Sequence, residues 1–148
     1  MPSTDPAGPS VPEQLSPYER MGGAAFFADL LHEFYVGVSA DAELRSLYPE
    51  ADLGPAERRF RMFLEQYWGG PQTYSQERGH PRLRLRHAPF VIDEAARDRW
   101  LAAMAHALDV TGPRHDLDPA LRADLWRYFT TGAAAMVNAE PPTGARWV

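Results

Sequence analysis

The fold is decided by the stretch RMFLEQYWGGP, residues 61–71, in which an amphipathic helix meets an abrupt stop. Apolar residues recur here at three- and four-residue spacing, which places them on one face of a helix. Pro55 fits the first turn of this helix, and Gly69-Gly70-Pro71 ends it. The sequence therefore predicts a helix from Pro55 to about Trp68. The residues that share one face of this helix are Ala56, Phe60, Phe63, Leu64 and Tyr67.

The same spacing predicts most of the remaining structure. From Ala24 to Val38 the apolar residues fall on one face of an amphipathic helix. Asp93 and Asp118 precede two later helices, where a carboxylate can accept hydrogen bonds from the first free N–H groups. The other predicted helices cover residues 18–21, 41–47, 93–108 and 118–136.

The segment between Pro71 and Asp93 is rich in Gly, Pro and Arg. We expect a loop there, with at most one or two helical turns around Arg82 to His87. Long irregular segments inside compact domains are often functional. No stretch of the chain shows the alternation of a strand, so the predicted fold class is all-α.

A second stretch, RLRLRHAPF at residues 82–90, contains the one histidine whose surroundings suggest a function. Pro89 disfavours helical backbone at Ala88, so the chain must turn just after His87. Histidine is the commonest metal ligand in proteins, and it is the proximal ligand by which globins hold haem iron. A packed or surface histidine is the simpler alternative, and the short stretch alone leaves both open.

The composition limits the class of protein. A chain of 148 residues fits one domain, and the absence of cysteine excludes disulfides, thiolate metal sites and covalently attached haem. The net charge of −5 argues against nucleic-acid binding. No apolar run is long enough to cross a bilayer, and the N-terminus lacks the features of a signal peptide, so we expect a cytoplasmic protein.

The two ends of the chain differ in composition from the middle. Residues 1–17 contain five prolines among small and polar residues, which predicts a flexible tail. Residues 140–148 form a second short tail that begins next to Pro141-Pro142. The folded domain is therefore expected to span residues 18–139.

Taken together, these stretches resemble the group II truncated haemoglobins. The matching motifs are RMFLEQYWGGP at 61–71, Tyr74-Ser75, RGHPRL at 78–83 and RHAPF at 86–90. The resemblance extends from about Tyr18 to Asn138. It implies a truncated globin domain in which two antiparallel helix pairs cross two-over-two around non-covalent haem b. It also implies that His87 is the proximal iron ligand, which leaves the opposite coordination position open.

The resemblance also implies a distal ligand-binding site. The matching residues are Tyr35, Tyr48, Ala56, Phe60 and Trp100. A phenol can donate a hydrogen bond and an indole N–H can only donate, so both stabilise a polarised diatomic ligand. We expect Tyr48 and Trp100 to contribute most and Tyr35 to assist. Ala56 neither donates nor blocks, whereas Phe60 stands where a smaller aliphatic residue is expected.

Further residues are expected to contact the haem itself. The predicted apolar contacts are Phe63, Leu64, Leu83, Phe90 and Met104, each of which would fit a plain core role equally well. The expected partners of the haem propionates are Arg59, Tyr74 and Arg86. The basic cluster of Arg78, Arg82, Arg84 and Arg86 is either a solvated face or a source of counter-charge for the propionates, and we expect a mixture in which one or two of these arginines lie near the propionates.

The function that follows from the resemblance is tight binding of oxygen, carbon monoxide or nitric oxide by haem, with slow ligand release. The alternative is a haem-dependent redox enzyme, such as a peroxidase or a nitric oxide dioxygenase, which would need an external reductase. A haem-free helical interaction module is a third class, but it leaves Tyr48 and His87 without a role. A homodimer is a further option that the sequence leaves open.

Overall fold

The computed structural model describes residues 15–87 and 90–138, and within these ranges all regular structure is helical. This finding confirms the all-α prediction. The helices in chain order are α1 (Pro17–Met21), α2 (Gly23–Ala40), α3 (Ala42–Arg45), α4 (Gly54–Tyr67), α5 (Thr73–Arg78), α6 (Leu83–His87), α7 (Glu94–Arg114) and α8 (Pro119–Met136).

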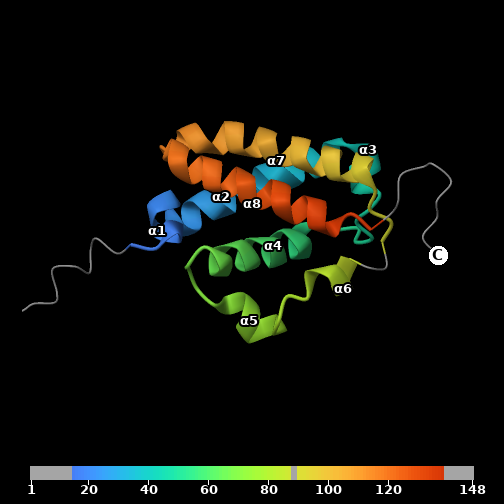
Figure 1. Cartoon of the computed structure of the whole chain (residues 1–148), viewed down its shortest axis with the longest axis horizontal. Coiled ribbons are helices and arrows are strands. Elements are labelled where there is room, and N and C mark those ends of the chain that lie inside the picture. The colour runs from blue at the N-terminus through green and yellow to red at the C-terminus, as the bar shows by residue number, and fades with distance from the viewer. Residues whose placement is uncertain (1–14, 88–89, 139–148) are drawn as a thin grey trace, which may run out of the picture.

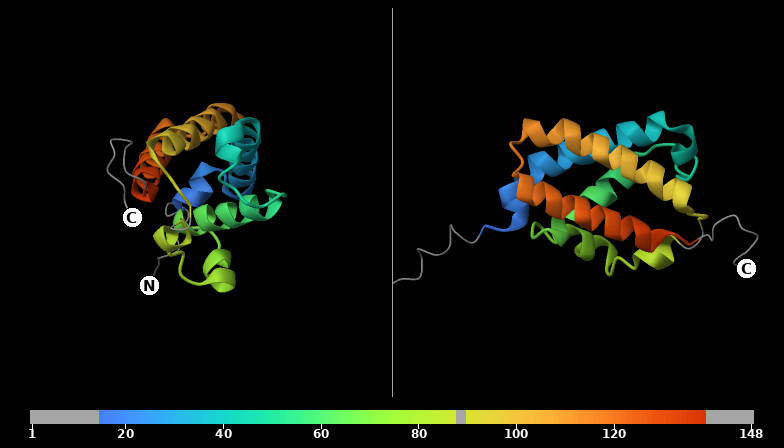
Figure 2. Two further views of the ribbon diagram at one scale, coloured as in Figure 1. Left: turned by 90° about the vertical axis from the view of Figure 1, so that its right-hand side faces the viewer. Right: turned by 45° about the horizontal axis from the view of Figure 1, so that its top comes forward.

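Four long helices form the framework as two pairs. Helix α2 packs against α4 and α7, and α7 also packs against α8. Figure 1 shows α7 and α8 running side by side, with α4 on the other side of α8 and α5 and α6 at the lower edge. The end-on view in Figure 2 places α4, α5 and α6 on the side opposite α7. The arrangement is the predicted two-over-two sandwich.

The helix starts follow from side-chain capping. The Ser16 hydroxyl accepts from the Glu19 N–H at 3.2 Å, and the Glu19 carboxylate accepts from the Ser16 N–H at 3.1 Å, which completes a capping box for α1. The Asp93 carboxylate accepts from Ala96 N–H at 2.8 Å, and that of Asp118 from Ala120 N–H at 2.9 Å. The caps predicted at Asp93 and Asp118 are therefore confirmed.

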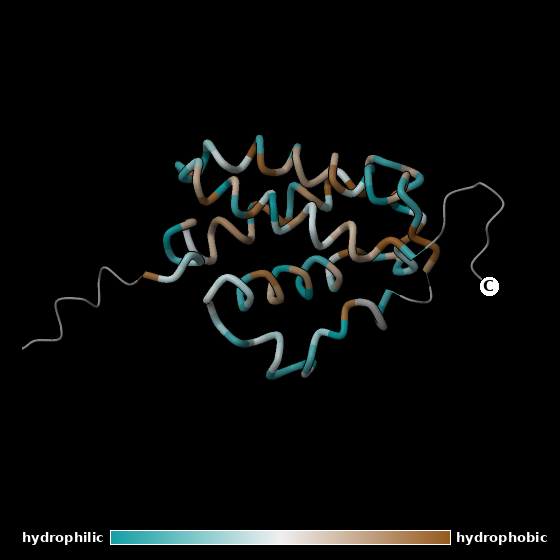
Figure 3. Tube along the Cα trace, viewed as in Figure 1, coloured by the Kyte–Doolittle hydropathy of each residue, from teal (hydrophilic) through white to brown (hydrophobic). Residues whose placement is uncertain are grey.

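The core is formed by the facing sides of α2, α4, α7 and α8. Its largest fully buried side chains include Phe26, Phe27, Phe34, Leu108 and Phe129. Figure 3 shows hydrophobic and hydrophilic segments alternating along α4, as expected for a helix with one apolar face.

The close packing and sharp turn at the end of α4 explain why Gly69 and Gly70 follow this helix. A side chain at Gly70 would place its Cβ 2.7 Å from Cδ1 of Tyr18 and 2.9 Å from the carbonyl oxygen of Glu65. Gly69 has a φ of +99°, a conformation that only glycine adopts easily. The chain can therefore turn sharply here, and the Tyr18 N–H donates to the Trp68 carbonyl at 2.8 Å.

The segment predicted to be mainly a loop contains a helix that was not expected. The prediction allowed helical turns only around Arg82 to His87, where α6 is found, but α5 also forms at Thr73–Arg78. Tertiary contacts stabilise α5, because Tyr74 is buried against the edge of Phe63 and the Gln66 side chain accepts from the Ser75 N–H at 2.9 Å. Such contacts are invisible in local composition.

The predicted end of α7 at Leu108 was wrong, because the helix continues to Arg114. The extra turns are buried rather than solvent-exposed. Thr111 is fully buried, and its hydroxyl donates to the Ala107 carbonyl at 2.8 Å, while Gly112 lets Leu117 and Arg122 approach closely. The buried face of α7 therefore continues through Thr111 and Gly112. A prediction based only on the spacing of large apolar residues ends the helix before them.

The predicted tails fall almost entirely outside the described residues. Of the N-terminal segment, Ser16 and Pro17 belong to the cap and first turn of α1. Within the described part of the chain, none of the helices has the length and hydropathy needed to cross a membrane.

Acid is expected to weaken a cluster that joins α2 to the end of α7. The Asp29 carboxylate accepts from Arg114 at 2.9 Å and lies 3.0 Å from Nε2 of His115. Burial by itself raises the pKa of Asp29, but hydrogen bonds from His115 and Arg114 outweigh it and hold the pKa below its usual value. The stabilisation is therefore present above the unfolded-state pKa of about 3.9 and is lost as pH falls through the lower folded-state pKa.

Urea unfolding of wild type and Asp29→Asn tests this expectation. The difference in unfolding free energy should be largest at neutral pH and should shrink below about pH 4, where the wild-type carboxylate becomes protonated. A difference that stays constant down to about pH 2 would contradict the role given to the Asp29 charge.

Candidate functional site

A cavity of about 520 Å³ lies among the helices and is bordered by residues from α2, α4, α6, α7 and α8. Its volume is within the range of about 300–1,000 Å³ that is usual for ligand and cofactor pockets. Most of its lining is apolar or aromatic. The predicted site residues that line it are Tyr35, Tyr48, Ala56, Arg59, Phe60, Phe63, Tyr74, Leu83, Arg86, His87, Phe90 and Trp100.

His87 lies at the C-terminal end of α6 and borders the cavity. Its Nδ1 atom is 2.7 Å from the carbonyl oxygen of Leu83, one helical turn earlier. A carbonyl oxygen can only accept, so this contact requires a proton on Nδ1. In the neutral ring, that tautomer leaves the lone pair of Nε2 available to a metal.

Aromatic rings form the wall that carries the predicted distal residues. The Phe34 ring meets Trp100 at a centroid distance of 5.1 Å and Phe60 at 5.8 Å, both edge to face. The rings of Tyr35 and Tyr48 meet in the same way at 5.8 Å. The structure therefore brings four of the five predicted distal residues into one aromatic cluster, and Ala56 lines the same cavity.

Tyr48 is held as a neutral phenol. Burial raises the pKa of Tyr48 to about 12, although interaction with Tyr35 and Trp100 partly offsets that rise. Burial also raises the pKa of Tyr35 well above its usual value, and the neighbouring Tyr48 adds to the effect. Both hydroxyl groups keep their protons at neutral pH, so each can donate a hydrogen bond.

Arg45 fixes the chain segment that carries Tyr48. Its guanidinium donates to the carbonyl oxygens of Tyr48 at 2.9 Å, Glu50 at 2.7 Å and Ala51 at 3.1 Å. The segment between α3 and α4 is therefore anchored at three points without regular structure of its own. This role of Arg45 could not be predicted from the sequence, because the contacts form only when the loop folds back over α3.

Arginines from four helices border the cavity, namely Arg59 on α4, Arg78 on α5, Arg86 on α6 and Arg97 on α7. Arg59 on α4 pairs with Glu50 at 2.6 Å, and its hydrogen bond holds the pKa of that carboxyl below the usual value. Arg78 lies over the Tyr74 ring at 5.9 Å, and Arg86 donates to the Pro81 carbonyl at 2.6 Å. No carboxylate among the described residues lies within 4 Å of the Arg78 or Arg86 guanidinium. Both can therefore pair with an anionic group.

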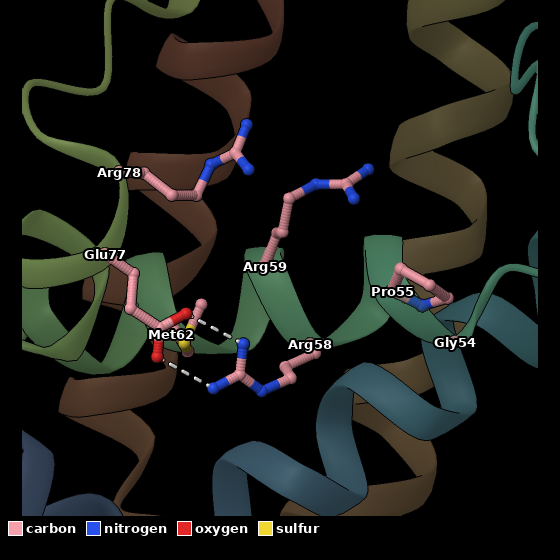
Figure 4. A pocket seen from close by; sticks show the side chains of 7 residues that line it. All are labelled: Gly54, Pro55, Arg58, Arg59, Met62, Glu77 and Arg78. Carbon is pink, nitrogen blue, oxygen red and sulfur yellow. Dashed lines mark hydrogen bonds and ion pairs between the residues drawn. The ribbon is translucent and has the colours of Figure 1, made fainter.

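A second, shallower recess of about 460 Å³ lies between α4 and α5. Figure 4 shows a two-pronged ion pair from Arg58 to Glu77 among its lining residues, while Arg59 and Arg78 point away from that pair. The two hydrogen bonds measure 3.0 and 2.9 Å. This ion pair ties α5 to α4 and thereby holds Arg78 where it also borders the main cavity.

Two predicted contacts lie elsewhere. Leu64 and Met104 are fully buried in the core and do not line the cavity. Conversely, the cavity wall includes Ile92, Tyr128 and Met136, which were not predicted as contacts. Arg78, predicted only as one member of the basic cluster, also lines the cavity. Its four-residue spacing to Tyr74 could have singled it out, but only if α5 had been recognised as a helix.

Comparisons with known proteins agree with this geometry. The family model described as bacterial-like globin matches residues 16–136. The group 2 truncated haemoglobin YjbI of Bacillus subtilis is 37% identical over 123 residues, which cover 83% of this chain and 89% of that protein. The chain belongs to the group II truncated haemoglobins.

Solved structures support the same placement of this truncated haemoglobin. The thermostable haemoglobin from the actinobacterium Thermobifida fusca is 51% identical, with a TM-score of 0.80 over 86% of this chain and all of that chain. The group II truncated haemoglobin from Bacillus anthracis is 36% identical, with a TM-score of 0.80 over 88% of this chain and 96% of that chain.

Family membership implies a haem cofactor and haem-based ligand binding for this truncated haemoglobin. The residues of the cavity fit that group. An apolar and aromatic lining suits a porphyrin, the His87 tautomer leaves Nε2 available for iron, and unpaired arginines at the border suit propionates. The absence of cysteine in the sequence fits haem held without covalent bonds.

Proposed function

We propose that this truncated haemoglobin binds oxygen and related diatomic gases tightly at a non-covalent haem b and releases them slowly. The observation that carries the proposal is the pairing of two features in one cavity: the His87 tautomer and the neutral donors around Tyr48. When bound, the haem iron supplies the coordination site for the gas.

The protein contributes the environment of that site. His87 offers Nε2 as the axial ligand, because the Leu83 carbonyl holds the proton on Nδ1. Arg78 and Arg86 are the proposed partners of the propionates, with Arg59 joining if it exchanges Glu50 for a propionate. The aromatic walls exclude water, which strengthens the hydrogen bonds made inside the cavity.

Slow release follows from the donors on the distal side. Tyr48 and Trp100 border the cavity, and their O–H and N–H groups are the proposed donors to a polarised gas molecule. Each such hydrogen bond contributes roughly 1.5–3 kcal/mol when the acceptor carries charge. Tyr35 is proposed to orient the Tyr48 hydroxyl.

Replacing Trp100 by Phe tests the donor role. The change removes the indole N–H but keeps an aromatic ring against Phe34 and Phe60. We expect oxygen to dissociate about tenfold to a hundredfold faster, as measured by stopped-flow displacement with carbon monoxide. Trp126→Phe is the matched control, because Trp126 packs against the core but does not line the cavity. Equal dissociation rates in wild type and Trp100→Phe would reject the assignment.

A further inference from the structure

Asn138, two residues after the end of α8, is hydrogen-bonded to His87 and to the chain that follows it. The Asn138 amide nitrogen donates to the carbonyl oxygen of Phe90 at 2.9 Å and to that of His87 at 3.3 Å. Its amide oxygen accepts from the Ile92 N–H at 2.9 Å. The Asn138 backbone N–H also donates to the Ile92 carbonyl at 2.9 Å.

These contacts engage both polar atoms of the asparagine amide. Two donors on one nitrogen meet two carbonyl oxygens, and the acceptor oxygen meets an N–H, so each polar atom has a complementary partner. The reverse orientation of the amide would oppose oxygen to oxygen and N–H to N–H. An amide can bind both types of backbone group at once, whereas an ionised carboxylate can only accept.

The contacts matter because α6 cannot hold His87 in place by itself. A helix of five residues is far below the length of about 12–15 residues at which isolated helices become stable. The packing of α6 in the described structure is mainly against α8, and Figures 1 and 2 both show α6 near the C-terminal end of α8. The position of the His87 backbone therefore depends on what α8 provides.

We infer that Asn138 is a positioning residue for the proximal histidine. It holds the His87 carbonyl directly, and it holds Phe90 and Ile92 on the far side of the turn. Groups that orient an axial ligand commonly change metal affinity by about 10–100-fold. Asn138 orients His87 through the backbone carbonyl of His87, whereas the Leu83 carbonyl orients the imidazole ring of His87. The inference rests on the proposed role of His87.

Asn138→Ala tests the inference in the haem-loaded protein. We expect haem to transfer to an acceptor apoglobin about 10–100-fold faster than from wild type. The iron–histidine stretching band in the resonance Raman spectrum of the reduced protein should shift or broaden, which a general loss of stability would not cause. Thr130→Ala is the matched control, because it removes a side-chain hydrogen bond on α8 that is made to Arg127 within the same helix.

A second variant separates the two sides of the asparagine amide. Asn138→Asp keeps an acceptor for the Ile92 N–H but turns a carboxylate oxygen towards the carbonyls of His87 and Phe90. In haem-free protein, amide hydrogen exchange at Ile92 should accelerate in Asn138→Ala and stay slow in Asn138→Asp. Haem loss should be fast in both variants.

The outcomes separate this inference from the proposed function. Suppose that wild type retains haem through His87, and that Asn138→Ala and Asn138→Asp have the same haem-transfer rate and the same iron–histidine band as wild type. The role of Asn138 is then overturned and the proposed function stands. If wild type retains no haem, the proposed function fails and the role of Asn138 towards an axial ligand fails with it. Unchanged exchange at Ile92 in Asn138→Ala would show that the side chain does not hold this turn.

Discussion

Replacement of His87 by Ala is expected to accelerate haem loss at least about a hundredfold. Removing a group that only orients a ligand costs about 10–100-fold in metal affinity, and His87 is the proposed ligand itself. The measurement is the rate of haem transfer to an acceptor apoglobin. Imidazole in the buffer should restore both the absorption spectrum and the retention of haem, because it can supply the missing nitrogen within the space left by the side chain.

The control for this substitution is His106→Ala. His106 is exposed on α7 and does not border the cavity, so its loss should leave haem retention unchanged. A His87→Ala protein with the wild-type spectrum and the wild-type rate of haem loss would show that another group holds the iron. In that case the hydrogen bond from His87 to Leu83 would be merely part of the end of α6.

Phe34→Ala is expected to cost about 3–5 kcal/mol in unfolding free energy, the usual range for removing a buried phenylalanine. Phe34 is fully buried, and its ring contacts Tyr35 at 4.9 Å in addition to Phe60 and Trp100. The loss is large beside a typical total stability of about 5–15 kcal/mol. Urea unfolding followed by far-ultraviolet circular dichroism measures it.

Val36→Ala provides the comparison on the same helix. Val36 is 51% exposed, so its truncation should change the unfolding free energy by no more than about 0.5 kcal/mol. If the two substitutions cost the same, the aromatic cluster around Phe34 would not be the main support of the distal wall. A large cost for Phe34→Ala alone would show that Phe34 is a main support of the fold.

The sequence predicted the parts of the fold that depend on local periodicity. The framework helices, the caps at Asp93 and Asp118 and the stop after Trp68 all follow from spacing, capping or glycine chemistry. Helix α5 and the last turns of α7 were missed because their stability comes from partners distant in the chain. The burial of Tyr74 against Phe63 is one such contact.

The site was predicted from the resemblance rather than from the residues alone. Trp100 taken alone is an ordinary core residue, and His87 taken alone is an ordinary histidine. The structure adds three contacts that neither pattern contains: the hydrogen bond between His87 and the Leu83 carbonyl, the three-point anchoring by Arg45 and the hydrogen bonds of Asn138. Each depends on backbone carbonyls or N–H groups, whose directions are set only when the chain has folded.

The central claim is that the cavity between the helix pairs holds haem with one coordination position open to gases. The most direct test is the ultraviolet–visible spectrum of the purified protein, reduced with dithionite and recorded before and after carbon monoxide is added, with haem supplied if the protein is isolated without it. We expect a haem band that sharpens and shifts when the gas binds. A protein that shows no haem band even after reconstitution would contradict the account.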